Sequence, residues 1–370
     1  MAEHALRREK LGLSLGRADV DALVVNGACN VTYLTGFSGD SSWLIASPNR
    51  QILVSDARYT QQIADECQGI EVHIRDTQQT IQQAVGDLLA KLGLHNVGIE
   101  GEQMSVANFE TLRSAAPTIS WSVQSKLVEN LRMIKDAGEQ AAIRSAIAMA
   151  EKAWEMFNAM LLPDDSEKDL SDAMEGYVRR AGATCTPFPT IVAVGSRSAL
   201  PHAPPTDRRV RESDFLLLDW GACDGQYRSD LTRMIVTRAA SGTVEKRFEE
   251  LYTVVLQAQQ RGIDAVRPGA RAAEVDAAVR NRLEEVGLNQ YFNHGLGHGI
   301  GLQTHEGPNV RLSSKDVLEA GMVFTIEPGI YLPDWGGIRI EDDVLVTEDG
   351  CEVLSRVPKD LGSVLGTKRA

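Results

Sequence analysis

The sequence lacks the features that mark secreted and membrane-spanning proteins. Its five cysteines are scattered over 370 residues, are odd in number and form no Cys-x-x-Cys pair, so a reducing compartment is the simplest interpretation. The first ten residues contain no apolar core of a signal peptide. No segment approaches the roughly 18 apolar residues of a membrane span. These absences favour a cytoplasmic protein.

Dense runs of lysine or arginine are also missing, and the formal net charge is −13. A nucleic-acid-binding surface needs a basic patch, so we expect neither nucleic acid nor a membrane as a partner. The content of 43% hydrophobic and 24% charged residues is ordinary for a globular protein. A chain of 370 residues exceeds one typical core, so two domains are expected.

The N-terminal part alternates between helical and strand-like segments, which predicts an α/β domain over residues 1–125. The turn-rich segment 30–39 is expected to cross its surface. We find no catalytic cluster in this domain, so its expected role is to cover a site or to pair with another subunit. The expected helices are 4–17, 57–67, 80–92 and 106–115, and the expected strands are 22–25, 43–46, 52–55, 72–74, 97–100 and 121–123.

The pattern changes in residues 126–370, the expected second domain. A long amphipathic helix is predicted over 135–161. Segments 163–182 and 268–287 resemble each other, since each runs from a proline through an amphipathic helix to a glycine. Either two such helices look alike by chance, or this α+β domain has two related halves with a pseudo-twofold repeat.

Each half is predicted to end in a β-hairpin that carries two acidic residues, one per strand. The first hairpin contains Asp219 and Asp230 on either side of an Asp-Gly turn, and the second contains Glu327 and Glu341. Two hairpins facing each other would bring the four carboxylates together. His298 comes from the glycine-rich segment between them.

These acids lie in apolar surroundings, which distinguishes them from ordinary solvated carboxylates. Asp219 follows Phe-Leu-Leu-Leu, Glu327 follows Val-Phe-Thr-Ile, and Glu341 follows Ile340. Buried carboxylates without a cation would repel one another and lose hydration. Four carboxylates and one imidazole suit two divalent cations, with Mn²⁺ expected and Co²⁺ or Zn²⁺ as alternatives. Such a pair can activate water and polarise a carbonyl.

Further histidines surround this set. His294, His298 and His305 lie within one glycine-rich stretch, and His202 precedes the first hairpin. A single histidine is more often structural, but this grouping favours a site in which histidines position substrate and move protons.

The motifs Asp-Trp-Gly, Ser-Asp-Leu-Thr-Arg, His-Gly-Leu-Gly-His-Gly-Ile-Gly, Thr-Ile-Glu-Pro-Gly and Arg-Ile-Glu-Asp-Asp together resemble the pita-bread metallopeptidases. The most similar branch contains the Xaa-Pro aminopeptidases and the Xaa-Pro dipeptidases, or prolidases. The segment around Tyr33 resembles the creatinase-type N-terminal domain of that branch. The resemblance covers nearly the whole chain and implies a proline-specific hydrolase that is expected to be a homodimer.

The resemblance also implies roles at matching positions. The implied metal ligands are Asp219, Asp230, His298, Glu327 and Glu341. Glu327 would also be the general base or proton shuttle, and His202 and His305 would be catalytic. The implied substrate-binding residues are His202, His294, His305, Tyr331 and Arg339. All five ligands are present, which argues against the metal-free relatives on this fold.

An Xaa-Pro bond has no N–H and contains a rigid ring, so its site needs an apolar slot and a proton donor near the nitrogen. Phe188, Trp220 and Tyr331 are predicted to line that slot. Many prolidase-like sequences carry arginine where Asn309 stands here, with Arg311 two residues further on. This difference favours an Xaa-Pro aminopeptidase, with a dipeptidase as the alternative. A methionine aminopeptidase and a non-enzymatic binding protein are more distant alternatives.

Overall fold

The computed structural model describes residues 2–237 and 246–366, which form two compact units. The N-terminal unit is Met1–Arg132 and the C-terminal unit is Met133–Ala370. The sequence predicts a division into 1–125 and 126–370, so the two divisions differ by the short helix α6 (Leu127–Met133). Nearly all of α6 lies in the N-terminal unit, where the Tyr33 hydroxyl donates to the carbonyl of Leu131.

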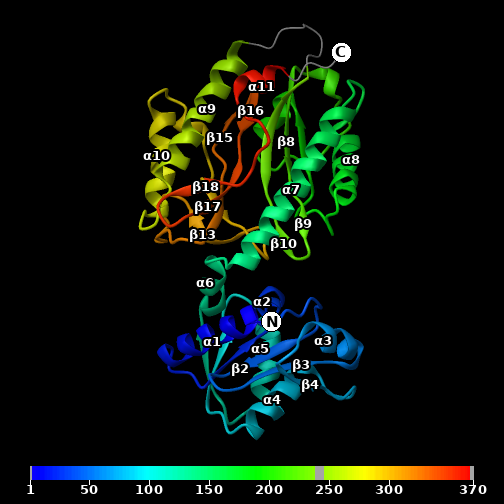
Figure 1. The fold of residues 1–370 in the computed structure, drawn as a ribbon, viewed down its shortest axis with the longest axis vertical. Coiled ribbons are helices and arrows are strands. Elements are labelled where there is room, and N and C mark those ends of the chain that lie inside the picture. Colours follow the sequence, from blue (N-terminus) through cyan, green and yellow to red (C-terminus); the bar gives the residue numbers. More distant parts are fainter. Residues whose placement is uncertain (1, 238–245, 367–370) are drawn as a thin grey trace. The chain divides into compact units, whose positions relative to one another are not determined.

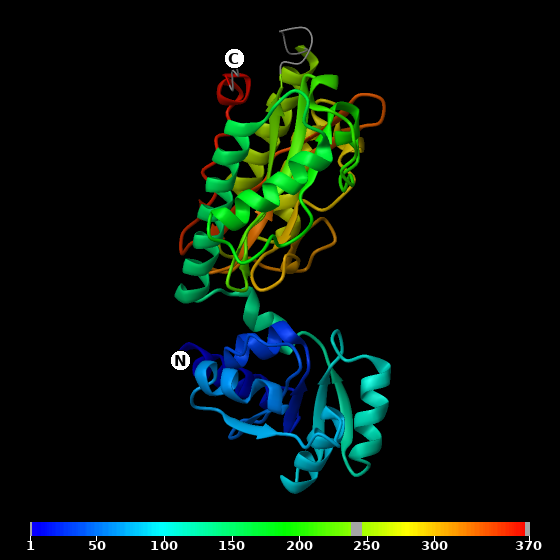
Figure 2. The ribbon, with the colours of Figure 1, turned by 90° about the vertical axis from the view of Figure 1, so that its right-hand side faces the viewer.

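The N-terminal unit is a six-stranded mixed sheet with the strand order β4-β3-β2-β1-β5-β6 (Figure 1). Strand β1 pairs antiparallel with β2 and parallel with β5. The helices α1, α2, α3, α4 and α5 accompany this sheet (Figure 2). The strands are β1 (Ala22–Val25), β2 (Trp43–Ala46), β3 (Gln51–Ser55), β4 (Glu71–Ile74), β5 (Asn96–Glu100) and β6 (Ser120–Gln124), and the helices are α1 (Ala2–Arg17), α2 (Ala28–Thr35), α3 (Thr60–Glu66), α4 (Ile81–Lys91) and α5 (Val106–Ala115).

The expected α/β domain is confirmed, but the expected turn-rich segment 30–39 is wrong in its first half. Helix α2 continues to Thr35 and ends at Gly36, whose φ of 81° few other residues adopt. Within the described ranges no side chain caps its first turn, and local propensity does not reveal this helix. Tertiary contacts hold it instead, because the buried Asn30 donates to the carboxylate of Glu100 at 2.6 Å.

The C-terminal unit contains two helix pairs on either side of short sheets (Figure 1). The main sheets have the strand orders β11-β8-β7 and β13-β12-β14-β17-β18. The helices are α7 (Ala137–Met160), α8 (Glu167–Arg180), α9 (Lys246–Ala265), α10 (Ala272–Glu284) and α11 (Leu361–Gly366). The strands are β7 (Ile191–Val194), β8 (Phe215–Trp220), β9 (Cys223–Asp224), β10 (Tyr227–Arg228), β11 (Leu231–Val236), β12 (Gly297–Gly299), β13 (Glu306–Val310), β14 (Val323–Ile326), β15 (Gly329–Leu332), β16 (Gly336–Arg339), β17 (Asp342–Val346) and β18 (Cys351–Val353).

The two halves of this unit run in the same order, which fits the expected repeat. A long helix, a shorter helix and then strands occur as α7, α8 and β7–β11, and again as α9, α10 and β12–β18. Both predicted hairpins are present. Strand β8 pairs antiparallel with β11, and the second hairpin is divided into a β14–β17 part and a β15–β16 part.

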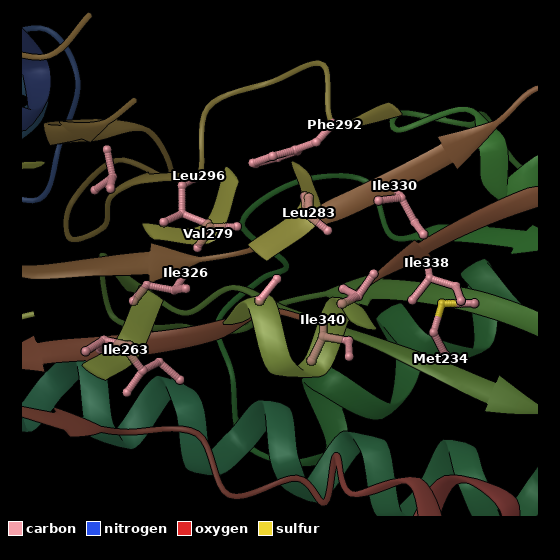
Figure 3. Packing of buried hydrophobic residues seen from close by; sticks show 14 of the residues in the cluster. Met234, Ile263, Val279, Leu283, Phe292, Leu296, Ile326, Ile330, Ile338 and Ile340 are labelled. Carbon is pink, nitrogen blue, oxygen red and sulfur yellow. The ribbon is translucent and has the colours of Figure 1, made fainter. Parts of the chain in front are cut away.

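The core of the C-terminal unit lies between these sheets and α9 and α10. Figure 3 shows Ile263 of α9 and Val279 and Leu283 of α10 near Ile326 and Ile340 of the second hairpin. A second cluster joins α7 and α8 to β8 and β11. Burying both faces of the hairpins in this way gives the acids at their strand ends a rigid support. No helix in the described part of the chain is long and apolar enough to cross a membrane.

Candidate metal centre and active site

A cavity of about 620 Å³ opens in the C-terminal unit, and all the predicted metal ligands, catalytic residues and substrate-binding residues except the slot residue Trp220 line it. Its lining combines proline and aromatic side chains with carboxylates and imidazoles. The predicted site residues that line it are Asp219, Asp230, His298, Glu327, Glu341, His202, His294, His305, Tyr331 and Arg339.

The centre of the cavity holds three side chains in ligand geometry. One potential ligand atom from each of Asp230, His298 and Glu341 lies within 4.8 Å of the others. His298 Nε2 lies 3.4 Å from Glu327 Oε1 and 3.8 Å from Asp230 Oδ2. A tight group of carboxylate oxygens and an imidazole nitrogen is a donor set for a divalent cation.

The backbone explains why residues far apart in sequence meet here. Asp219 lies in β8, Asp230 directly precedes β11, Glu327 follows β14 and Glu341 precedes β17. An isolated bridge between Thr232 and Glu341 joins the two hairpins. Each hairpin therefore supplies two acids at the line where the two halves meet.

His298 occupies β12, a three-residue strand that neighbouring backbone approaches closely. A Cβ atom at Gly297 would lie 1.9 Å from the carbonyl oxygen of Thr325, and one at Gly299 would lie 1.9 Å from that of Gly307. Only glycine fits at both positions, so the glycine-rich motif is a packing requirement that places the imidazole between β13 and β14.

Asp219 is held by a different contact. Its Oδ2 accepts a hydrogen bond from Arg339 Nη2 at 2.5 Å, and its Oδ1 is buried with no hydrogen-bond partner among the residues that the structure describes. A buried carboxylate oxygen with no donor is costly unless a further positive group lies against it.

Comparison with known proteins assigns this arrangement to a family. Residues 141–348 match the model of metallopeptidase family M24, and residues 7–134 match the creatinase/prolidase N-terminal domain. The chain belongs to metallopeptidase family M24. The predicted family and the pita-bread fold are thus confirmed, and this chain is a metal-dependent peptidase.

Relatives of this M24 peptidase extend over nearly its whole length. An Xaa-Pro dipeptidase from Pyrococcus horikoshii is 33% identical over 349 residues, which cover 94% of this chain and 96% of that protein. The structure of an Xaa-Pro dipeptidase from Bacillus anthracis has a TM-score of 0.91 and 34% identity, and the match covers 97% of this chain and 99% of that one. The structure of an X-Pro aminopeptidase from Thermotoga maritima has a TM-score of 0.85 and 32% identity, with 94% and 99% covered.

The carboxylates of this M24 peptidase carry strongly shifted pKa values. Burial raises the pKa of Glu327 to about 8. Burial, reinforced by Glu341 and Asp219, holds the pKa of Asp230 well above its usual range. Burial, reinforced by Glu327 and Asp219, does the same to Glu341. Burial and mutual repulsion both destabilise the ionised form of these acids. A divalent cation bound between them would offset both effects, because its positive charge attracts the carboxylates.

The pKa values of the imidazoles in the cavity are shifted in the opposite direction, to lower values. Burial lowers the pKa of His294 and of His298 to about 4 and also lowers the pKa of His305. His298 is therefore neutral at pH 7 and can act as a ligand through Nε2. The His298 and His305 rings lie 4.2 Å apart between centroids, while His294 Nε2 lies 2.9 Å from the Tyr331 hydroxyl.

Several residues that support the acids were not predicted. Thr232 Oγ1 donates to Glu341 Oε2 at 2.6 Å and accepts from Arg339 Nε at 3.0 Å. Asp343 Oδ2 accepts from the backbone N–H of Asp230 at 3.1 Å. Spacing was the one sequence signal that could have identified Thr232. It lies two residues after Asp230, and alternate residues of an extended segment face the same side.

The prediction that Trp220 lines the substrate slot is wrong. Its side chain is fully buried, stacks on Trp154 at 5.2 Å and donates from Nε1 to the Ala150 carbonyl at 2.9 Å. Successive strand residues face opposite sides, so Asp219 on the cavity side places Trp220 against α7. Phe188 and Tyr331 do line the cavity, as predicted.

Proposed function

We propose that this M24 peptidase is an Xaa-Pro dipeptidase that hydrolyses the bond before proline with two divalent cations. The two dipeptidase relatives described above support the dipeptidase over the aminopeptidase that the sequence favoured. The observation that carries the choice is Arg311, which lines the same cavity as the candidate metal ligands.

Arg311 is the proposed substitute for the arginine that many prolidase-like sequences carry at the position of Asn309. Both residues line the cavity: Asn309 lies in β13, and Arg311 directly follows that strand. A dipeptide has its carboxylate one residue beyond the scissile bond. A guanidinium in the same cavity as the hydrolytic centre can bind that carboxylate in a bidentate manner.

The proposed ligands are Asp219, Asp230, His298, Glu327 and Glu341. Four carboxylates and the Arg339 guanidinium carry a net charge of −3, which one divalent cation leaves at −1 and two bring to +1. One or two cations therefore balance this cluster far better than none, and it is the number of ligands, five, that favours two. When bound, they would supply an activated water and polarise the substrate carbonyl.

The side chains around the ligands are proposed to transfer protons and to bind the substrate. Glu327 is the proposed proton acceptor, with a carboxyl pKa that burial raises toward neutrality in the metal-free protein. His202 and His305 are the proposed donors to the proline nitrogen, which becomes a secondary amine when the bond breaks. His294 and Arg339 both hydrogen-bond the Tyr331 hydroxyl, which fixes the ring against the cavity.

The apolar part of the cavity suits the substrate ring. Phe188, Pro189, Pro201 and Pro204 line it beside the histidines. Rigid apolar surfaces can hold a pyrrolidine ring without any contact to an N–H that proline lacks.

An Xaa-Pro aminopeptidase is the second candidate. The Thermotoga maritima structure supports it, and so does Asn309 at the position where prolidase-like sequences carry arginine. In that case Arg311 would meet the backbone of a longer peptide and not a free carboxylate.

The test compares Ala-Pro with Ala-Pro-Ala as substrates in the presence of Mn²⁺, for the wild type and for Arg311→Met. We expect the wild type to prefer Ala-Pro, and Arg311→Met to raise KM for Ala-Pro at least tenfold with a smaller change in kcat. Arg211→Met, which removes an exposed arginine of the same unit, is the matched control. A wild type that cleaves only the tripeptide would establish the second candidate instead.

A further inference from the structure

The second hairpin has a gap in its ladder at the position of its two acids. Strand β14 pairs with β17 as far as Ile326 opposite Asp342, and β15 pairs with β16 from Gly329 opposite Arg339. Glu327 and Glu341 lie in the interval between these pairs. One main-chain hydrogen bond crosses this interval, from the Ile340 N–H to the Pro328 carbonyl at 3.3 Å. Proline has no N–H, so Pro328 donates none in return.

The side chain of Gln259, which is fully buried in α9, spans the gap. Its Nε2 donates to the carbonyl of Ile326 at 3.1 Å and to the carbonyl of Ile340 at 3.1 Å. These carbonyls belong to the peptide units that directly precede Glu327 and Glu341. The Ile326 and Ile340 side chains are fixed in the core (Figure 3), so each of these residues is anchored on both its side chain and its carbonyl.

The amide of Gln259 is itself held in one orientation. Lys359 Nζ donates to Gln259 Oε1 at 2.9 Å, which leaves Nε2 facing the carbonyls. Asp342 Oδ2 is a third acceptor for Nε2 at 3.0 Å, and Asp342 Oδ1 accepts from Arg233 Nη2 at 2.7 Å. A buried amide whose donors and acceptor all form hydrogen bonds is held rigidly in place.

We propose that Gln259 is a positioning residue that fixes the separation of the Glu327 and Glu341 carboxylates and thereby sets the affinity of the centre for divalent cations. This inference rests on the proposed function. The two carboxylates repel each other. Their backbone N–H groups donate to the carbonyls of Leu296 and Thr232 on other segments, so these bonds do not fix the distance between the two strands. Gln259 opposes their separation from behind the site, since it does not line the cavity and cannot contact substrate there. Groups that orient metal ligands typically change metal affinity by roughly 10- to 100-fold.

The test measures Mn²⁺ binding by calorimetry to chains first freed of metal, without any substrate. The variants are Gln259→Met, which keeps the length of the side chain but removes both donors, and Gln259→Glu, which keeps its shape. The matched control is Gln260→Met, because Gln260 is the next residue of the same helix and is exposed. Thermal unfolding in EDTA is recorded for each protein, and Gln259→Glu serves if Gln259→Met does not fold.

We expect Mn²⁺ affinity at least tenfold weaker than wild type for the Gln259 variants, and affinity within twofold of wild type for Gln260→Met. A Gln259 variant that loses stability in EDTA yet binds Mn²⁺ like the wild type would overturn the inference, since its role would then be structural alone. If the wild type and Gln260→Met take up no Mn²⁺, the proposed function fails before the Gln259 variants are compared.

Discussion

At the scale of single residues, the site is a set of groups shifted away from their ordinary protonation. Four carboxylates have raised pKa values because they are buried together, and burial lowers the pKa of His298. The sequence predicted the members of this set, since Asp219 and Glu327 follow apolar runs and Glu341 follows Ile340. It did not reveal the groups that orient them, such as Thr232 and Gln259, because neutral polar residues have no distinctive pattern.

These shifts predict how the stability of the metal-free protein depends on pH. A folded pKa of about 8 for Glu327 lies above its unfolded value, so the folded protein keeps a proton that the unfolded chain releases. Stability must therefore fall as pH rises towards 8. Below about 6.5 the histidines have the opposite effect, because their folded pKa of about 4 lies below the unfolded one. Between pH 6.5 and 8, therefore, the buried carboxylates and not these histidines determine how stability changes with pH.

In that window we expect Glu327 to lower the stability of the metal-free protein by on the order of 1–2 kcal/mol, which lowers the melting temperature by several degrees. Thermal unfolding in EDTA measures the change, and Glu327→Gln should make the decline smaller, while the raised pKa values of Asp230 and Glu341 keep part of it. Mn²⁺ should remove the decline, because cations bind the ionised carboxylates. A metal-free protein whose stability rises with pH across this window would contradict the assignment.

At the scale of elements, periodicity and turn signals predicted both hairpins, the long helix and most of the N-terminal sheet. They failed at α2 and at β12, where tertiary contacts decide the conformation. Helix α2 has no side-chain cap, and β12 is a run of glycine and histidine that resembles a loop. The pairing of β12 with β13 and β14 depends on backbone contacts between distant segments, which a local pattern does not encode.

One buried ion pair connects the segment before α7 to β13. Lys135 Nζ lies 2.9 Å from Glu306 Oε1, and both side chains are almost fully buried. Glu306 follows His305, so this pair also supports the strand that begins beside a proposed proton donor. Removing the lysine leaves a carboxylate buried without its cation, which is more costly than losing an exposed pair.

We therefore predict that Lys135→Met lowers the free energy of unfolding by about 3–5 kcal/mol, measured by urea denaturation. Adding Glu306→Gln should recover part of the loss because it removes the stranded charge. Lys168→Met breaks an exposed pair with Asp172 and should change nothing measurable. Equal effects of the two lysine substitutions would show that burial does not decide the strength of these pairs.

At the scale of the whole molecule, two related halves each contribute two acids to one centre. The repeated order of helices and strands allowed that arrangement to be predicted from the sequence. The way in which the halves join was not predictable, because the bridge from Thr232 to Glu341 forms only when both hairpins are folded. The expected homodimer stays a prediction.

We propose that Asp219, Asp230, His298, Glu327 and Glu341 form a hydrolytic centre for two cations. The most direct measurement counts Mn²⁺ bound per chain by elemental analysis, with hydrolysis of Ala-Pro followed on the same samples, for the wild type and for Asp230→Asn. We predict two ions per wild-type chain, at most one in Asp230→Asn, and a fall in kcat/KM of at least about 1,000-fold. An Asp230→Asn protein that keeps both ions and the wild-type rate would contradict the proposal that these residues form the hydrolytic centre.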